Sequence, residues 1–268
     1  MPPLIKRRSR RQRLKMGEIF THRSFHEPEA VKQELLGAVS AFVGPEVTEK
    51  HFTPRYRPWR QRIAFVPDGD IFQKVKEGKA SVVTDEIERF TEKGILLKSG
   101  QELEADIIVT ATGFKLCVLG DIAFEVDGKA VDFADTVTYR GMMFTGVPNL
   151  VWVFGYFRAS WTLRVDIMAD FVCRLLGHMD EIGAKKVSVA LRPEDSGMAI
   201  ESWIDPENFN PGYLMRDMHR MPKRGDKPEW QHTQDYWAER NALPLIDLSG
   251  PEFVYEGAKV RPEAIAAE

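Results

Sequence analysis

The chain has 268 residues, of which 43% are hydrophobic and 29% are charged, and this composition indicates a globular protein with enough apolar side chains for one large core or two small ones. Its formal net charge of −3 provides no overall basic field, so we expect no nucleic-acid partner. Two cysteines, Cys117 and Cys173, are too few for a secreted disulfide framework, and no apolar run reaches the ~18 residues that span a bilayer. We therefore expect a protein of the reducing cytoplasm with no membrane partner.

The N-terminal stretch MPPLIKRRSRRQRLK carries seven Lys or Arg residues and no acid. Such a run is typical of an arm that binds nucleic acid or anionic lipid. The alternative is the exposed face of a helix or a linker, which we favour because the rest of the chain is acidic.

An amphipathic helix is predicted next, from Pro28 to about Gly44. Proline suits the first helical position and glycine suits the end, while Val31, Leu35 and Phe42 fall on one face. His22 and His26 precede this helix at a spacing of four, but no third ligand is close in the sequence, so we expect no metal site.

From residue 60 the pattern becomes that of short strands rich in Val, Ile and Thr, with turn signals at Lys93-Gly94 and Ser99-Gly100. It predicts an antiparallel meander. The expected strands are 62–66, 80–85, 86–92, 94–99 and 102–110. The last of them ends in DIIVT (106–110), which we expect to be buried on both faces.

A second buried strand is predicted at 150–156, followed by a helix that begins after Ser160, a credible N-cap. Together they resemble half of a doubly wound α/β unit. The remaining sequence from about residue 180 is rich in Pro, Gly, Trp and charge, and we expect a loop-rich wrap over the rest.

The sequence contains no G-x-S-x-G, no H-E-x-x-H, no G-x-G-x-x-G and no Walker A loop. The small residues Ala111, Thr112 and Gly113 close the predicted strand at 106–110, and they would let the backbone approach a flat or phosphorylated ligand. A simple tight turn at Gly113 explains them equally well.

The run from His51 to Leu116, with DIIVTATGFKL at its end, resembles the C-terminal half of class B flavoprotein monooxygenases, the flavin-containing and Baeyer-Villiger enzymes. GVPNLVWVFGY and the helix after it are similar to the last strand of their FAD domain and the turn beneath the flavin. The resemblance covers residues 5 to 255. It implies a partial α/β fold with two dinucleotide-binding domains, FAD and NADPH as cofactors, and a small organic substrate that receives one oxygen atom from O2.

The resemblance also assigns roles. Arg62 corresponds to an arginine beside the flavin, where a permanent charge suits the stabilisation of a developing anion. A structural salt bridge to Asp68 or Asp70 is the alternative for Arg62. Gln61 stands where many relatives have a lysine that helps to hold NADPH. The residues implied to contact FAD are Thr112, Gly113, Phe114, Phe157, Arg158, Ala159, Ser160 and Trp161.

The departures from the family are the missing G-x-G-x-x-G motifs and the missing F-x-G-x-x-x-H fingerprint. We therefore predict the C-terminal remainder of an NADPH-binding domain at 1–79, the meander and the last part of an FAD-binding domain at 80–178, and an extension at 179–268. The first hypothesis is a half-enzyme that needs an N-terminal half as a separate chain. The alternatives are an inactive remnant and a binding module that uses the basic arm.

Overall fold

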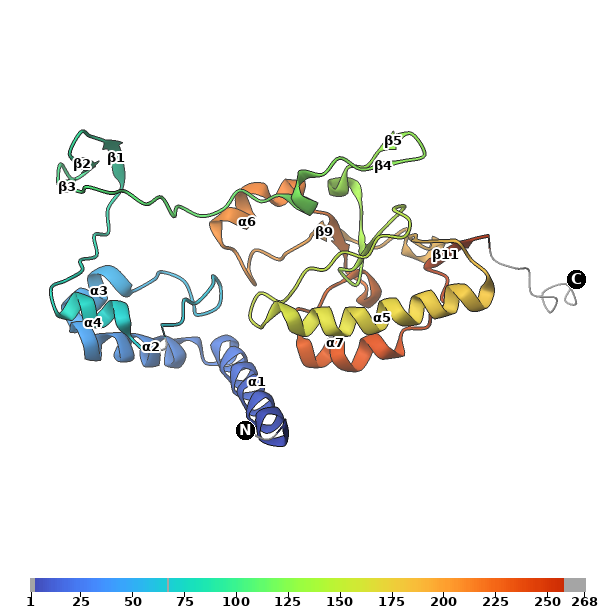
Figure 1. Cartoon of the computed structure of the whole chain (residues 1–268), viewed down its shortest axis with the longest axis horizontal. Helices are drawn as coiled ribbons and strands as arrows, with labels where there is room; N and C mark the ends of the chain where they lie inside the picture. Colours follow the sequence, from blue (N-terminus) through green and yellow to red (C-terminus); the bar gives the residue numbers. More distant parts are fainter. Residues whose placement is uncertain (1–2, 67, 258–268) are drawn as a thin grey trace, which may run out of the picture. The chain divides into compact units, whose positions relative to one another are not determined.

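The computed structural model describes residues 3–66 and 68–257, and the side chains of residues 3–11 and 13 lie outside this description. The chain forms two compact units, Met1–Phe114 and Lys115–Glu268 (Figure 1). Within the described residues, no helix is both long and apolar enough to cross a membrane.

The first unit begins with helices, which are α1 (Pro3–His26), α2 (Pro28–Val43), α3 (Pro45–Phe52) and α4 (Asp70–Lys76). The predicted helix from Pro28 is confirmed, and Val31 on its apolar face is fully buried. The basic stretch forms the start of α1, but most of its side chains lie outside the described residues, so the arm prediction stays a prediction.

His22 and His26 lie inside α1, not ahead of a first helix as their position before Pro28 suggested. The ring centroids of His22 and His26 are 4.0 Å apart, as expected for side chains one helical turn apart. No group of three metal-ligating side chains occurs among the residues that the structure describes.

A three-stranded antiparallel sheet completes the first unit, with β1 (Ile87–Phe90), β2 (Gly94–Leu97) and β3 (Glu102–Glu104) in that order. The predicted meander is therefore confirmed in its last three strands. The prediction of strands at 62–66 and 80–85 is wrong, because neither segment pairs with a strand in the described part of the chain. Alternating Val and Ile residues supply strand propensity, but a strand also needs a partner for its backbone.

The predicted burial of the segment at 106–110 is also wrong. These residues form no strand, and Ile107 and Val109 are each 82% exposed. The apolar run is extended backbone with no strand beside it among residues 3–66 and 68–257. Its composition is that of a buried parallel strand, although the segment forms none here.

The second unit is built around α5 (Trp161–Ile182), the long helix predicted after Ser160. Its two-stranded pairs are all antiparallel and are listed here with their bounds: β4 (Glu125–Val126) with β5 (Lys129–Ala130), β6 (Thr138–Tyr139) with β7 (Met143–Phe144), β8 (Lys186–Val189) with β11 (Phe253–Glu256), and β9 (Ile200–Ser202) with β10 (Lys223–Gly225). Two further helices are α6 (Gly212–Asp217) and α7 (Tyr236–Ala242).

The C-terminal part from residue 180 packs into the core of the second unit. It supplies β8 to β11 and two helices, and both Trp203 and Trp230 are fully buried. The apolar face of α5, including Ile167, Met168 and Phe171, packs in one core cluster with residues of this C-terminal part. Proline and glycine mark the turns between these short elements and do not imply a lack of core.

Candidate functional site

The turn that connects residue 154 to α5 is the centre of the candidate site. The predicted strand at 150–156 is wrong as a strand, because this segment is extended but joins no ladder among the described residues. A single backbone bond, from Trp152 N to Met142 O at 2.7 Å, ties it to the hairpin of β6 and β7. Gly155 lies directly under Trp161, since a Cβ at this position would be 2.3 Å from the indole Cγ. Only glycine allows this close approach.

Side chains from residues 234–239 hold this turn at three successive positions. The Phe157 amide donates to Gln234 Oε1 at 2.8 Å, and Gln234 Nε2 donates to the Gly155 carbonyl at 3.2 Å. The Tyr156 hydroxyl donates to Glu239 Oε2 at 2.6 Å. Burial, followed by the negative charge of Glu239, raises the pKa of Tyr156, so the phenol stays protonated and acts as the donor.

A buried ion pair lies behind the turn. Arg164 of α5 is 0% exposed, and its Nε and Nη2 donate to Glu239 Oε2 and Oε1 at 2.8 and 3.1 Å. Its other donations go to three carbonyl oxygens: Phe154 at 2.7 Å, Gly141 at 3.2 Å and Arg140 at 2.7 Å. The guanidinium therefore joins the turn, the β6–β7 hairpin and α7 through a complete set of hydrogen bonds, which offsets the cost of burying its charge.

A cavity of about 210 Å³ adjoins the turn, and Phe157, Arg158 and Gln234 are among its lining residues. His232 and Trp203 also line it, with ring centroids 4.2 Å apart. His232 Nε2 donates to the Trp203 carbonyl at 2.7 Å, while His232 Nδ1 has no hydrogen-bond partner among the described residues. Burial lowers the pKa of His232 to about 3, so the ring is neutral and its Nδ1 is an acceptor.

The far end of the turn is open to solvent. Ala159, Ser160 and Trp161 are exposed, while Phe157 is buried and stacks on Phe209 with ring centroids 4.4 Å apart. Ser160 occupies the N-cap position of α5, but its side chain makes no capping bond, and its Oγ lies 2.9 Å from Thr162 Oγ1. The prediction of Ser160 as the N-cap residue is therefore confirmed, although its side chain supplies no capping hydrogen bond.

The remaining predicted FAD contacts lie in the first unit. Thr112, Gly113 and Phe114 are exposed and lie outside any helix or strand. Gly113 has a φ of 107°, a conformation that disfavours residues with a Cβ, so the small residue meets a backbone requirement there.

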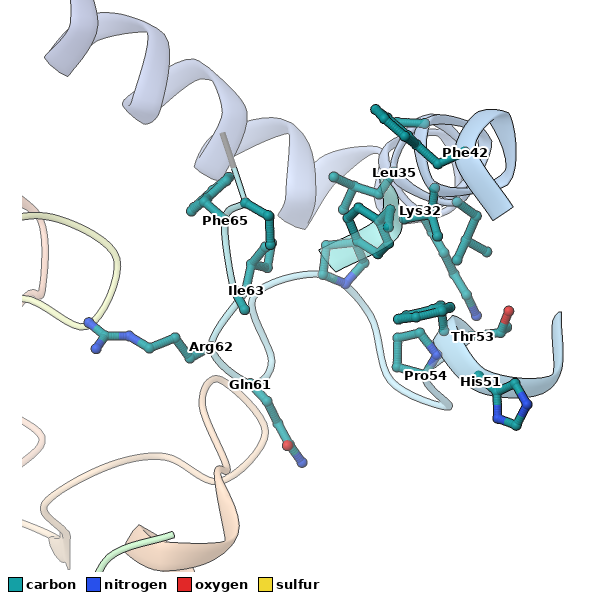
Figure 2. A pocket seen from close by; sticks show the side chains of 18 of the residues that line it. Lys32, Leu35, Phe42, His51, Thr53, Pro54, Gln61, Arg62, Ile63 and Phe65 are labelled. Atoms are coloured by element: carbon teal, nitrogen blue, oxygen red, sulfur yellow. The ribbon is translucent and has the colours of Figure 1, made fainter. Parts of the chain in front are cut away.

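Arg62 lies at a large apolar pocket within the first unit. The pocket has a volume of about 690 Å³ and lies among α2, α3, α4 and the segment around residues 53–69. Leu35 and Phe42 lie on its helical side, whereas the side chains of Gln61 and Arg62 extend away from that side (Figure 2). The pocket is mostly hydrophobic, and Arg62 contributes one of its few charged groups.

The residues present fit one part of an FAD site. In the second unit, the exposed residues 159–161 leave room for the approach of a flat ring. The sequence supplies no glycine-rich phosphate loop, so the part of a site that would hold a pyrophosphate is not among these residues.

The sequence analysis missed the residues that hold the turn, namely Arg164, His232, Gln234 and Glu239. One signal was available for Arg164, because it lies three and four residues before Ile167 and Met168 and therefore on the buried face of α5. Gln234 and Glu239 are about 80 residues beyond the turn, and no local pattern links them to it.

Comparison with curated proteins identifies relatives named as flavin monooxygenases. The chain is 43% identical over 217 residues to a probable FAD-binding monooxygenase AlmA of Acinetobacter baylyi, covering 81% of this chain and 43% of the relative. It is 47% identical over 213 residues to the FAD-containing monooxygenase EthA of Mycobacterium tuberculosis, covering 79% of this chain and 42% of that protein. The chain thus spans less than half the length of the curated relatives it matches.

Two solved structures share the fold. One is OTEMO in a complex with FAD and NADP, with a TM-score of 0.61 and 16% identity over 86% of this chain and 45% of that one. The other is cyclohexanone-bound cyclohexanone monooxygenase, with a TM-score of 0.54 and 17% identity over 85% of this chain and 43% of that one. No family model matches the chain.

Proposed function

Because the chain belongs to the family of FAD-containing monooxygenases, we propose that it forms the C-terminal portion of an FAD- and NADPH-dependent monooxygenase. The identity of 43–47% to two such relatives, over about four-fifths of the chain, is the observation that carries the proposal. The two neighbouring structures support the same fold. The proposed setting is the reducing cytoplasm, and Cys117 and Cys173 are both free thiols.

When bound and reduced by NADPH, the flavin would supply the chemistry that transfers one oxygen atom of O2 to a ketone or to a nitrogen or sulfur atom. Within the chain, Arg62 supplies a fixed positive charge that stabilises negative charge developing beside the ring. Thr112, Gly113 and Phe114 are the proposed FAD contacts of the first unit. The proposed FAD contacts of the second unit are the turn from Phe157 to Trp161, where the exposed start of α5 offers amide groups.

Two apolar extended segments support the proposal that a further polypeptide completes the enzyme. Residues 106–110 and 150–156 have the composition of buried strands, yet neither joins a sheet within the described residues. Ile107 and Val109 are each 82% exposed, and Val153 is 42% exposed, whereas Phe154 and Tyr156 are buried. Exposed apolar backbone without a strand partner, as at residues 106–110, is costly in water and promotes pairing with another chain. We propose an N-terminal half as that chain, carrying both glycine-rich phosphate loops.

The proposed domain limits follow from the same correspondence. Residues 1–79 would be the remainder of the NADPH domain, 80–178 the meander with the last part of the FAD domain, and 179–268 a C-terminal extension. Gln61 replaces the family's lysine and weakens the proposed contact with NADPH, because an amide lacks the charge that attracts a phosphate.

The decisive experiment is reconstitution. The 268-residue chain is mixed with the part of a 43–47% identical relative that lies outside the aligned region, and the mixture is passed through gel filtration with FAD. We expect visible flavin absorbance to elute with the complex and NADPH to be consumed. The chain alone should retain little flavin, since each charge-assisted hydrogen bond to a phosphate contributes about 1.5 to 3 kcal/mol and the phosphate loops are absent.

Two results would contradict parts of this proposal. A chain that stays yellow by itself and consumes NADPH would show that no second half is required. A mixture that forms a complex but never retains flavin would show that these residues do not build an FAD site.

A further inference from the structure

The end of the turn comprises the half-buried Arg158 and the exposed residues 159–161, and it extends from a backbone that other parts of the chain hold in place. Gly155 and Phe157 flank Tyr156 and share one partner, the side-chain amide of Gln234. Its oxygen accepts from the Phe157 amide at 2.8 Å and its nitrogen donates to the Gly155 carbonyl at 3.2 Å. This is the donor and acceptor pattern that a neighbouring strand would offer to an extended segment. A single glutamine thus replaces one rung of a sheet at a segment that has no strand partner among the described residues.

The backbone position of Gln234 is fixed by the residues around it. Its φ of 55° is in the left-handed region, which is unfavourable for a residue with a long side chain and is maintained only by the surrounding structure. Asp235 follows as the N-cap of α7 and accepts from the Trp237 and Ala238 amides at 2.8 and 3.0 Å. The start of α7 therefore fixes the position from which the glutamine reaches the turn.

The first turn of the same helix contains Glu239, which accepts from Tyr156 and forms the buried ion pair with Arg164. Gln234 and Glu239 thus bind three successive residues of the turn. Gln234 lies just before α7 and Glu239 lies within it, so this helix sets the positions of both. A shift of this turn would also move Trp161, because the ring of Trp161 lies directly on Gly155. The geometry of residues 158–161 is consequently coupled to that of α7.

We propose that Gln234 is a positioning residue for the flavin. It sets the backbone of Gly155 to Phe157 and thereby the placement of residues 158–161 against the ring. This inference rests on the proposed function, because residues 158–161 meet the flavin only if the chain forms part of an FAD site. Gln234 is remote in sequence from the turn and has no role implied by the family resemblance.

Two variants separate the two hydrogen bonds. Gln234→Met keeps the length of the side chain and removes both bonds, whereas Gln234→Glu keeps an acceptor for the Phe157 amide and loses the donor to Gly155. The matched control is Gln231→Met, because Gln231 is in the same segment but its Nε2 donates to the Asp226 carbonyl and not to the turn. Thermal unfolding of each variant first shows that the second unit is folded.

The first readout is amide hydrogen exchange of residues 154–160 in the 268-residue chain alone. We expect exchange at Phe157 to be about tenfold faster in Gln234→Met, which corresponds to the loss of one to two hydrogen bonds, and unchanged in Gln231→Met. The second readout is FAD affinity and the shape of the visible flavin band in the reconstituted complex. We expect about tenfold weaker binding with an altered band for Gln234→Met, and an intermediate effect for Gln234→Glu.

Each outcome decides the inference. Unchanged amide exchange at Phe157 in Gln234→Met means that Gln234 does not hold the turn, and this result overturns the inference. Faster exchange with unchanged flavin affinity and spectrum means that the turn is held for stability only, which also overturns it. If the wild-type complex binds no FAD, the proposed function is wrong, and so is the proposed role of Gln234 toward the flavin. The exchange data then show separately whether Gln234 holds the turn.

Discussion

The Arg164 guanidinium and the Glu239 carboxylate form an ion pair with an Nε–Oε2 distance of 2.8 Å, and their side chains are 0% and 4% exposed. Removing one partner of such a pair leaves a buried charge without compensation, which typically costs about 3 to 5 kcal/mol. We therefore expect Arg164→Met to lower the free energy of unfolding of the second unit by about that amount. Urea denaturation followed by tryptophan fluorescence measures it.

The control for this prediction is Arg174→Met on the same helix. Arg174 donates to the carbonyl oxygens of Leu243 and Ile246 at 2.9 and 2.6 Å, but no ion pair is recorded for it among the described residues. We expect a loss of about 1 to 3 kcal/mol, because two carbonyls lose a donor without a charge being stranded. An equal loss in the two variants would contradict the special role of the Arg164–Glu239 pair.

The close approach of Gly155 and Trp161 leads to a second prediction. A Cβ at residue 155 would be 2.3 and 2.5 Å from atoms of the indole ring and 2.7 Å from the Trp161 Cα. Because the Cα cannot move aside as a side chain can, Gly155→Ala should displace the start of α5 and cost at least about 1 to 3 kcal/mol. Thermal unfolding and near-ultraviolet circular dichroism report both effects.

Gly177→Ala is the matched control within α5. No atom lies within 4 Å of a Cβ built at this position, and it is in the interior of the helix. Alanine restricts the unfolded chain and is expected to stabilise the second unit by about 0.5 to 1 kcal/mol. A gain of stability in Gly155→Ala as well would show that the turn has room that the structure does not indicate.

Two helices of this fold could be predicted from the sequence, because the signals that define them lie within the helices and at their ends. The helices from Pro28 and from Trp161 carry their apolar periodicity and their boundary residues within a single stretch, so periodicity and capping signals suffice. The three strands of the meander pair with their nearest neighbours in the sequence, so turn signals place them too.

The predicted strands at 106–110 and 150–156 do not form within the described residues, and no feature of the sequence indicates this. Val and Ile residues report that a segment suits a sheet, but they carry no information on whether a neighbouring strand is present in the same chain. The candidate site shows a similar limit. Gly155 and Ser160 could be selected from local pattern, whereas Gln234 reaches the turn only through the tertiary fold.

A third prediction concerns pH and rests on His232. Burial, reinforced by the positive charges of Arg164 and Arg224, lowers the pKa of this histidine to about 3 from an ordinary value of 6.5. Below pH 6.5 the unfolded chain takes up a proton that the folded chain cannot accept, so the stability is complete above pH 6.5 and falls as the pH decreases toward 3. Between pH 6.5 and 5 the loss should approach about 2 kcal/mol.

His232→Gln is the variant that checks this prediction, because glutamine can still donate to the Trp203 carbonyl without titrating. We expect its unfolding free energy to be nearly flat between pH 6.5 and 5 in urea titrations. Asp195 does not interfere, since hydrogen bonding to Arg192 lowers the pKa of that carboxyl, and its contribution is lost only below its ordinary value of 3.8. A wild-type chain whose stability does not change between pH 6.5 and 5 would contradict the neutral, buried state of His232.

The last prediction tests the assignment of Arg62 in the reconstituted enzyme. Lysine at this position keeps the charge but replaces the planar fork of donors with a single ammonium group, so Arg62→Lys separates charge from geometry. Removing a group that stabilises developing charge typically lowers the rate about 10²- to 10³-fold. We expect Arg62→Ala to reduce oxygen transfer to a ketone by this factor, with a smaller loss in Arg62→Lys, and with flavin reduction by NADPH largely retained in both.

Arg55→Ala, at an exposed arginine seven residues earlier, is the control and should leave both steps unchanged. Equal losses in flavin reduction and oxygen transfer would instead assign Arg62 to cofactor binding or folding.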